Sequence, residues 1–258
     1  MLKILFLDID GTIRLNNKID SRIIKSIADL NTLGVKVILN TGRNFLHARK
    51  LARKLAVYPI IIACNGSLIK RVDNNEIISL NAIPRTTVRK IFTFTKDHNC
   101  QLLAHEPTNN YYIRNNDSIG TNITGLTITS SNYDRMLALK YLFEDRIPEV
   151  TVANSSKAIY LETRLSGKVY FHDINVQGIT KGYGIIKTLS YLGINPDEAM
   201  AIGDSNNDIA MSKVVKTSVA TENATPKLKQ ISTIVLDEPL GAYLEKLIKI
   251  IKEKRENL

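Results

Sequence analysis

Short apolar runs alternate with amphipathic stretches at both ends of this chain. Residues 3–7 and 35–39 are such runs, and a short apolar run bounded by a turn is typical of a buried strand in a parallel sheet. Residues 21–33 and 45–55 instead repeat their apolar positions every three or four residues, which predicts helices. Strands that alternate with helices predict a parallel sheet covered by helices on both faces. We therefore expect an α/β protein with a Rossmann-like core.

The middle of the chain has a different pattern, in which helices and strands do not alternate regularly. The expected elements are helices over residues 86–98 and 133–145 and strands near residues 102–105, 111–114, 158–163 and 169–172. We interpret this part, residues 82–177, as an inserted α+β domain, connected near residues 82–84 and 175–177. Residues 1–81 and 178–258 would then form one discontinuous core domain.

Two carboxylates, Asp8 and Asp10, follow the first apolar run. Ligands bind beyond the carboxyl ends of strands in parallel sheets, so these side chains are placed for chemistry. A calcium loop of the EF-hand type requires Gly at its sixth position and Glu at its twelfth. A loop that began at Asp8 would have Ile13 and Ile19 there, which excludes that interpretation.

A second acidic cluster, Asp204 and Asp208, follows another apolar run at residues 199–203. Two carboxylates about 5 Å apart repel by roughly 3 kcal/mol at an effective dielectric constant of ~20. If both clusters meet in one pocket, the carboxylates must therefore hold protons or bind a cation. Oxygen ligands favour Mg²⁺, and the four histidines and two cysteines have no spacing typical of zinc sites.

Two further positions suggest a phosphate site. Thr41 and Gly42 follow the expected strand at residues 35–40, where a hydroxyl and free backbone amides can surround phosphate oxygens. Lys181 precedes the amphipathic stretch that begins near residue 185. A lysine at the start of a helix opposes the helix dipole, and an anionic partner would explain it. Taken one at a time, an ordinary turn and a solvated lysine remain the alternatives.

Taken in order, residues 8–12, residues 41–43, Lys181 and residues 203–208 resemble the four motifs of the haloacid dehalogenase superfamily. The chain is most similar to the Cof-like sugar-phosphate phosphatases, in which a large α/β cap domain is inserted between the second and third motifs. Residues 63–66 (Ala-Cys-Asn-Gly) resemble the Asn-Gly element of that branch. The resemblance implies a Rossmann-like core and a cap at residues 82–177.

The resemblance also implies an activity, namely Mg²⁺-dependent hydrolysis of small phosphorylated metabolites through an aspartyl-phosphate. Asp8 would be the nucleophile, and Asp10 the general acid and base. Mg²⁺ would be held by Asp8, the backbone carbonyl of Asp10 and Asp204, with Asp208 in support.

Other positions would bind the substrate. By the same resemblance, the residues that bind the phosphoryl group would be Thr41, Gly42, Lys181 and Asn207. Asn65 and Arg43 would contact the substrate.

Two other functions remain open on the same motifs: a phosphomutase of this fold, and a non-catalytic protein that binds a phosphorylated metabolite. The net charge of +10 raises nucleic-acid binding as a third. However, residues 82–176 carry only 11 Lys/Arg against 9 Asp/Glu, and the remaining charge is spread over helical faces that are expected to be solvated.

The sequence also bears on partners and location. No apolar span reaches the length of a membrane helix, and residues 2–7 are too short for a signal-peptide core. We therefore expect a cytoplasmic protein with a small phosphorylated metabolite as its partner, no nucleic acid and no membrane. The expected oligomeric state is a monomer or a weak homodimer.

Overall fold

The chain in this computed structural model divides into two compact units. The first consists of Met1–Ser79 and Thr180–Leu258, and the second of Leu80–Ile179. The structure describes residues 1–154 and 169–256. The strand expected near residues 158–163 lies outside the described residues. Within the described residues, no helix is both long and apolar enough to cross a membrane.

The first unit is built on an eight-stranded sheet with the order β13-β12-β11-β1-β2-β3-β4-β5. Its strands are β1 (Ile4–Leu7), β2 (Lys36–Asn40), β3 (Ile60–Ala63), β4 (Leu68–Arg71), β5 (Ile77–Leu80), β11 (Ala199–Gly203), β12 (Thr217–Ala220) and β13 (Ile234–Val235). Neighbours from β13 to β3 run parallel, and β4 runs antiparallel to β3. The predicted α/β class with a parallel core sheet is confirmed.

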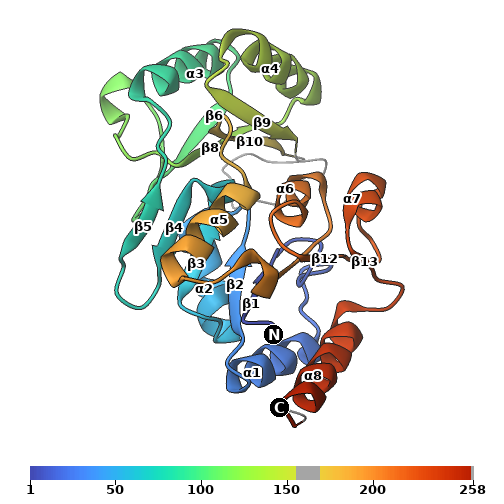
Figure 1. Ribbon diagram of the computed structural model, residues 1–258. Helices are drawn as coiled ribbons and strands as arrows, with labels where there is room; N and C mark the ends of the chain where they lie inside the picture. Colours follow the sequence, from blue (N-terminus) through green and yellow to red (C-terminus); the bar gives the residue numbers. More distant parts are fainter. Residues whose placement is uncertain (155–168, 257–258) are drawn as a thin grey trace. The chain divides into compact units, whose positions relative to one another are not determined.

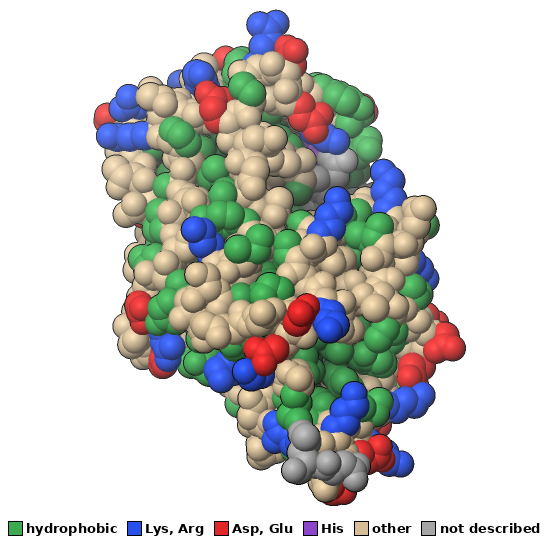
Figure 2. Space-filling model, in the orientation of Figure 1, with side chains coloured by type: hydrophobic (Ala, Val, Ile, Leu, Met, Phe, Trp, Pro, Cys, Tyr) green, Lys and Arg blue, Asp and Glu red, His purple; other side chains and the backbone are tan. Residues whose placement is uncertain are grey.

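Helices cover this sheet (Figure 1). On the face drawn in Figure 2, Lys and Arg side chains are scattered among other side chains and do not gather in one patch. The α-helices are α1 (Ser21–Thr32), α2 (Phe45–Leu55), α5 (Lys181–Leu192), α6 (Ile209–Ser212), α7 (Pro226–Ile231) and α8 (Leu240–Glu256). Three 3₁₀ turns accompany them: η1 (Cys64–Gly66), η3 (Pro196–Glu198) and η4 (Asn206–Asp208). Side-chain caps begin α1 and α2, where Asp20 accepts the Arg22 amide and Asn44 accepts the His47 amide. The helices predicted over residues 21–33 and 45–55 are confirmed.

The strands of this sheet are apolar throughout because both faces are buried. On one face, Ile4 and Phe6 of β1 pack in a cluster with Ile185 of α5. On the other face, Leu5 and Leu7 are also completely buried. A strand covered on both sides reads as a continuous apolar run. A polar residue directly after such a run therefore marks the edge of the sheet, where strands end and loops begin.

The second unit has a five-stranded antiparallel sheet with the order β7-β6-β8-β10-β9. Its elements are α3 (Arg85–Asp97), β6 (Gln101–His105), β7 (Asn110–Tyr112), η2 (Asn116–Ser118), β8 (Gly125–Ser130), α4 (Tyr133–Arg146), β9 (Val150–Asn154) and β10 (Tyr170–Val176). Helices α3 and α4 lie along this sheet (Figure 1), and their apolar residues form one core with it. The predicted helices over residues 86–98 and 133–145 are confirmed, whereas β8 and β9 were not expected.

The length of β10 differs from our expectation. We placed a strand over residues 169–172 and a connecting segment at residues 175–177. Instead, β10 continues through Val176, paired with β8 on one side and β9 on the other. Asp173 and Asn175 lie within this strand, each paired with a residue of β9. They share one face of the strand and Ile174 lies on the other, and Asn175 is buried like Ile174.

Candidate active site

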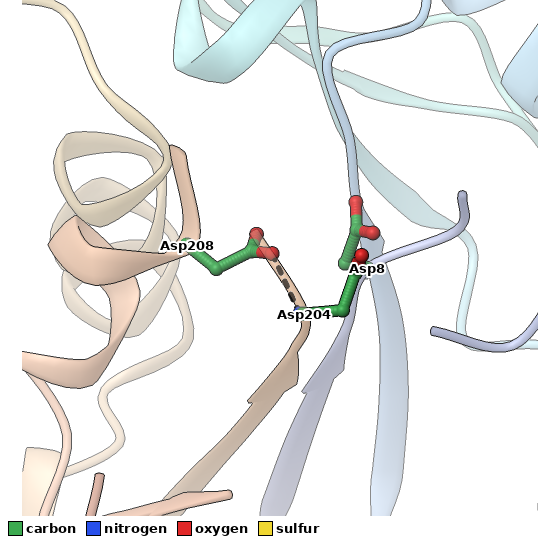
Figure 3. Close-up of side chains that lie close together, drawn as sticks. All are labelled: Asp8, Asp204 and Asp208. Carbon is green, nitrogen blue, oxygen red and sulfur yellow. Dashed lines mark hydrogen bonds between the residues drawn. The ribbon is translucent and has the colours of Figure 1, made fainter. Parts of the chain in front are cut away.

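The two acidic clusters meet at one edge of the core sheet. β1 and β11 are adjacent parallel strands with Leu7 opposite Ile202, so the residues that follow them emerge side by side. Carboxylate oxygens of Asp8, Asp204 and Asp208 all lie within 4.8 Å of one another. Figure 3 shows these side chains pointing toward a common space, from two strand ends and the turn that follows. The structure thus brings together three residues up to 200 positions apart.

Lys181 lies inside this acidic cluster. Its Nζ donates hydrogen bonds to Asp8 Oδ1 at 2.5 Å and to Asp208 Oδ1 at 2.6 Å, and the residue is 1% exposed. Lys181 is the first residue of α5, whose N-cap Thr180 accepts the amide of Tyr183. Burial acts to lower the pKa of Lys181, but the charges of Asp208 and Asp8 outweigh it and raise the pKa overall. Lys181 therefore carries a positive charge at the centre of the site.

One lysine does not balance the acidic groups. Burial raises the pKa of Asp8 to about 8, and repulsion from Asp208 and Asp204 adds to this effect against the opposing charge of Lys181. Burial and then Asp208 also raise the pKa of Asp204. Three ionised carboxylates around one ammonium have a net charge of −2. A divalent cation matches this charge, and carboxylate oxygens suit Mg²⁺.

Asp208 differs from Asp8 and Asp204 in its hydrogen bonds. Its Oδ2 accepts hydrogen bonds from the backbone amides of Asp204 and Ser205, both at 2.9 Å, while its Oδ1 accepts Lys181. Both oxygens are thus engaged within the chain. Asp208 fixes the loop after β11 and orients Lys181, so Asp8 and Asp204 are the better candidates for direct cation ligands.

The position of Asp204 depends on the first motif. Thr12 Oγ1 donates to Asp204 Oδ1 at 3.0 Å. Gly11 has a φ of +91°, and a Cβ there would lie 2.1 Å from Asp204 Oδ2. Both the backbone conformation and the close approach require glycine. Asn223 donates from Nδ2 to the Gly11 carbonyl at 2.9 Å, a further hydrogen bond that holds this turn.

Asp10 lies apart from this cluster. Its side chain is 52% exposed and forms a two-point ion pair with Arg43, with distances of 2.5 Å from Nε to Oδ2 and 2.6 Å from Nη2 to Oδ1. The sequence had suggested a substrate contact for Arg43. In the structure its partner is the residue expected to act as general acid and base.

The remaining predicted residues gather at the ends of β2 and β3. Asn207 donates from Nδ2 to Asn65 Oδ1 at 3.2 Å, and a Cβ on Gly42 would lie 3.2 Å from the same oxygen. The amide of Asn65 donates to the carbonyl of Thr41 at 3.0 Å. Asn65 itself has a φ of 53°, a left-handed conformation that Asn tolerates better than most residues. The structure therefore brings together Thr41, Gly42, Asn65 and Asn207.

Sequence reasoning missed several residues that support the site. Asn40 is completely buried and donates from Nδ2 to the backbone carbonyl of Lys181 at 3.0 Å. A polar residue that closes an apolar strand was the available signal. Thr12 stood within the first motif, yet its bond to Asp204 depends on a contact 192 residues away and left no local trace.

Comparison with known proteins agrees with this geometry. The family described as haloacid dehalogenase-like hydrolase matches residues 5–239. The chain belongs to this family, and the resemblance to its Cof-like phosphatases is confirmed. It is accordingly an enzyme of the phosphatase class.

Similar curated proteins cover almost the whole chain. A phosphoglycolate phosphatase of Methanopyrus kandleri is 26% identical, over 96% of this chain and 98% of its own length. The 5-amino-6-(5-phospho-D-ribitylamino)uracil phosphatase YcsE of Bacillus subtilis is 27% identical, over 96% and 95% respectively. The matches thus extend over nearly the full length of both relatives.

Solved structures share the fold. A haloacid dehalogenase-like hydrolase from Bacteroides thetaiotaomicron has a TM-score of 0.84 and 19% identity, covering 96% of this chain and 100% of its own. The subclass IIB sugar phosphatase BT4131 has a TM-score of 0.74 and 20% identity, covering 95% and 98%. These likenesses support the fold of both units.

Proposed function

We propose that this enzyme is a Mg²⁺-dependent phosphomonoester hydrolase that acts on small phosphorylated metabolites. The observation that carries the proposal is the meeting of Asp8, Asp204 and Asp208 around Lys181 at the carboxyl edge of the core sheet. A nucleophilic carboxylate, a buried cation and a net negative site are together the groups that phosphoryl transfer through an aspartyl-phosphate requires.

The donor set fits Mg²⁺. Asp8, Asp204 and the backbone carbonyl of Asp10 would hold the ion, and Asp208 would support the loop that carries Asp204. When bound, the ion would neutralise charge on the phosphoryl oxygens and keep Asp8 ionised at neutral pH. The raised pKa values of Asp8 and Asp204 support this assignment because they show how poorly the chain alone stabilises these charges.

In the first step, Asp8 attacks phosphorus opposite the ester oxygen. A bond forms between a carboxylate oxygen and phosphorus while the bond from phosphorus to the leaving oxygen breaks. Asp10 donates its proton to that oxygen, so the alcohol leaves neutral. Lys181 stays charged and offsets the negative charge of the transferring group.

In the second step, Asp10 is a carboxylate and takes a proton from water. The water oxygen attacks phosphorus, and the bond between phosphorus and Asp8 breaks. Inorganic phosphate leaves, Asp8 is restored as a carboxylate, and Asp10 holds a proton for the next cycle. Thr41, Gly42 and Asn207 would bind the phosphoryl oxygens in both steps.

The names of the relatives support the proposed substrate class. Their names specify phosphoglycolate and a phosphorylated ribitylaminouracil, both small metabolites with one phosphate ester. We propose the same general class here, with Asn65 contacting the substrate. We also propose that the inserted domain, residues 82–177, acts as a cap that selects the leaving group.

A phosphatase assay tests the proposal. The purified protein is incubated with 4-nitrophenyl phosphate, with Mg²⁺ or with EDTA, and nitrophenol and inorganic phosphate are both measured. Equal release of the two products with Mg²⁺ and none with EDTA is expected. Isomerisation of a sugar phosphate without release of free phosphate, measured in a separate incubation, would indicate a phosphomutase. Binding of phosphorylated metabolites without turnover would indicate a sensor.

A further inference from the structure

The ion pair between Asp10 and Arg43 follows from the order of the strands. β1 and β2 are adjacent and parallel, with Leu7 opposite Leu39. Asp10 comes three residues after Leu7, and Arg43 four residues after Leu39, so both side chains start at the same edge of the sheet. In the two-point geometry each oxygen of the carboxylate accepts one N–H and keeps a second lone pair that can carry a proton. The pair thereby fixes the plane of the group as well as its position.

The backbone of Arg43 is held firmly enough to set that geometry. Its amide donates to Thr41 Oγ1 at 3.1 Å, and its carbonyl accepts the Cys64 amide at 2.9 Å. The turn that carries Asp10 is closed by two backbone hydrogen bonds, from Gly11 to Arg14 and from Arg14 to Ile9. The pair therefore joins two ordered loops, and its guanidinium fork is the direct link between them.

The pair is too exposed to serve mainly for stability. The side chain of Asp10 is 52% exposed and that of Arg43 is 29% exposed. Exposed ion pairs contribute little to folding, because water screens the charges and both side chains lose freedom. A fixed carboxylate matters much more for proton transfer, which needs the donor within hydrogen-bond distance of the leaving oxygen.

We propose that Arg43 is a positioning residue for Asp10: its guanidinium holds the Asp10 carboxyl group in the orientation that protonates the leaving group. This inference rests on the proposed function, since it assumes that Asp10 is the general acid. It assigns Arg43 a role different from anchoring the phosphoryl group. Loss of a phosphate anchor would slow the reaction of every substrate, whereas loss of a positioning residue would slow mainly substrates whose leaving group needs a proton.

The dependence on the leaving group separates these roles. Nitrophenolate departs without a proton, whereas an alkoxide requires one. The ratio of kcat/KM for 4-nitrophenyl phosphate to that for propyl phosphate therefore reports proton donation. A change in phosphate binding affects both esters alike and therefore leaves this ratio unchanged. Hydrolysis of the aspartyl-phosphate occurs later and does not enter kcat/KM.

The experiment compares this ratio in wild type, Arg43→Ala, Arg43→Lys and Asp10→Asn. We expect the ratio to rise about 30- to 100-fold in Arg43→Ala, because misplacement of a catalytic group costs rates of this order. Arg43→Lys keeps the charge but lacks the fork, so it should show a similar rise. In an Asp10→Asn background, Arg43→Ala should change the ratio less than twofold.

Arg71 provides a matched control. It forms the same fork with Asp73, from Nε at 3.0 Å and Nη2 at 2.5 Å, also on the surface of the first unit. Arg71→Ala should leave the ratio unchanged. Thermal unfolding of all variants verifies that each is folded, and Arg43→Lys serves if Arg43→Ala does not fold.

The outcomes are distinct. Equal losses on both esters in Arg43→Ala would make Arg43 a phosphate anchor and overturn the inference. An unchanged ratio with unchanged rates would make the pair a surface contact, and full rescue by Lys would show that charge rather than orientation matters. A wild-type protein that hydrolyses neither ester with Mg²⁺ would overturn the proposed function, and the assignment of Arg43 with it.

Discussion

Lys181 donates a hydrogen bond to Asp8 at 2.5 Å, although 173 residues separate the two in sequence. The lysine also donates to Asp208 Oδ1 at 2.6 Å, so it joins the end of β1 to the turn after β11. Moving a charged side chain out of water costs free energy even when it is paired. Removing its partner leaves an uncompensated buried charge, which costs more. We therefore expect Lys181 and its two carboxylate partners to contribute to both catalysis and stability, and the predictions below separate these contributions.

Replacing Asp8 should abolish turnover while the protein stays folded. Asp8→Asn keeps the volume and a hydrogen-bond acceptor for Lys181 but removes the nucleophile. Loss of a nucleophile costs on the order of 10⁴-fold or more in rate. Activity on 4-nitrophenyl phosphate with Mg²⁺ measures this loss. Asp73→Asn, a change at an exposed ion pair, should be fully active. Turnover of Asp8→Asn at the wild-type rate would remove Asp8 from the mechanism.

Replacing Lys181 should affect both rate and stability. Lys181→Ala leaves the buried carboxylates of Asp8 and Asp208 without their cation, and breaking such a pair costs about 3–5 kcal/mol. We expect a lower midpoint of thermal unfolding without Mg²⁺, with part of the loss recovered when Mg²⁺ is added. Exposed Lys246, paired with Glu238, provides the control Lys246→Ala, which should change stability little. Equal stability of Lys181→Ala and Lys246→Ala would contradict this prediction.

Mg²⁺ should stabilise the folded protein. A ligand that binds only the folded state adds about 2.7 kcal/mol at a hundredfold excess over its Kd. Thermal unfolding midpoints measured over a Mg²⁺ titration should therefore rise in wild type and stay nearly constant in Asp204→Asn. Asp97→Asn, at an exposed position in the second unit, should behave as wild type. A similar rise in Asp204→Asn and wild type would place the bound ion elsewhere.

Gly11→Ala should displace the Asp204 side chain in addition to straining the backbone at residue 11. A Cβ at Gly11 would collide with the Asp204 carboxylate, whereas one at Gly34, also at positive φ (+67°), would meet no atom within 4 Å. Gly34→Ala thus measures conformational strain alone, about 1–2 kcal/mol. We expect Gly11→Ala to lose more stability and at least tenfold in kcat, while Gly34→Ala keeps normal kcat. Equal kcat in both variants would show that the contact with Asp204 is unimportant.

The second unit contains a carboxylate that should make stability depend on pH. Burial raises the pKa of Asp173 to about 6, against a hydrogen bond from Thr127 that lowers it. Because the folded pKa lies above the unfolded value of 3.8, the contribution of Asp173 to stability is fully present below about pH 4 and is lost as pH rises through 6.

Asp173→Asn should remove this part of the pH dependence. Asn keeps an oxygen that can accept the Thr127 hydroxyl but does not ionise. The variant should be more stable than wild type at pH 7.5, by up to roughly 3 kcal/mol, because one pH unit between folded and unfolded pKa corresponds to about 1.4 kcal/mol. At pH 4 the difference should vanish. Unfolding midpoints between pH 4 and 8 test this, and parallel curves for the two proteins would contradict it.

Much of the fold could be predicted because its signals are local. The helices α1, α2, α3 and α4 begin and end within one residue of their expected positions, since caps and apolar spacing act over a few residues. The strands β8 and β9 were missed although both alternate apolar and polar residues (Leu-Thr-Ile-Thr and Val-Thr-Val), because their pairing involves residues distant in sequence. The end of β10 was misplaced for the same reason.

What the sequence alone determined was the set of chemical groups and their placement at strand ends. Apolar runs that stop at Asp8 and at Gly203 specify buried strands, and parallel strands bring their carboxyl ends to one edge. Only the tertiary structure decided how those groups pair. Asp208 is held by backbone amides and Lys181, and Arg43 pairs with Asp10. Such pairing depends on how separate loops are placed relative to one another in three dimensions, which hydrophobic periodicity does not encode.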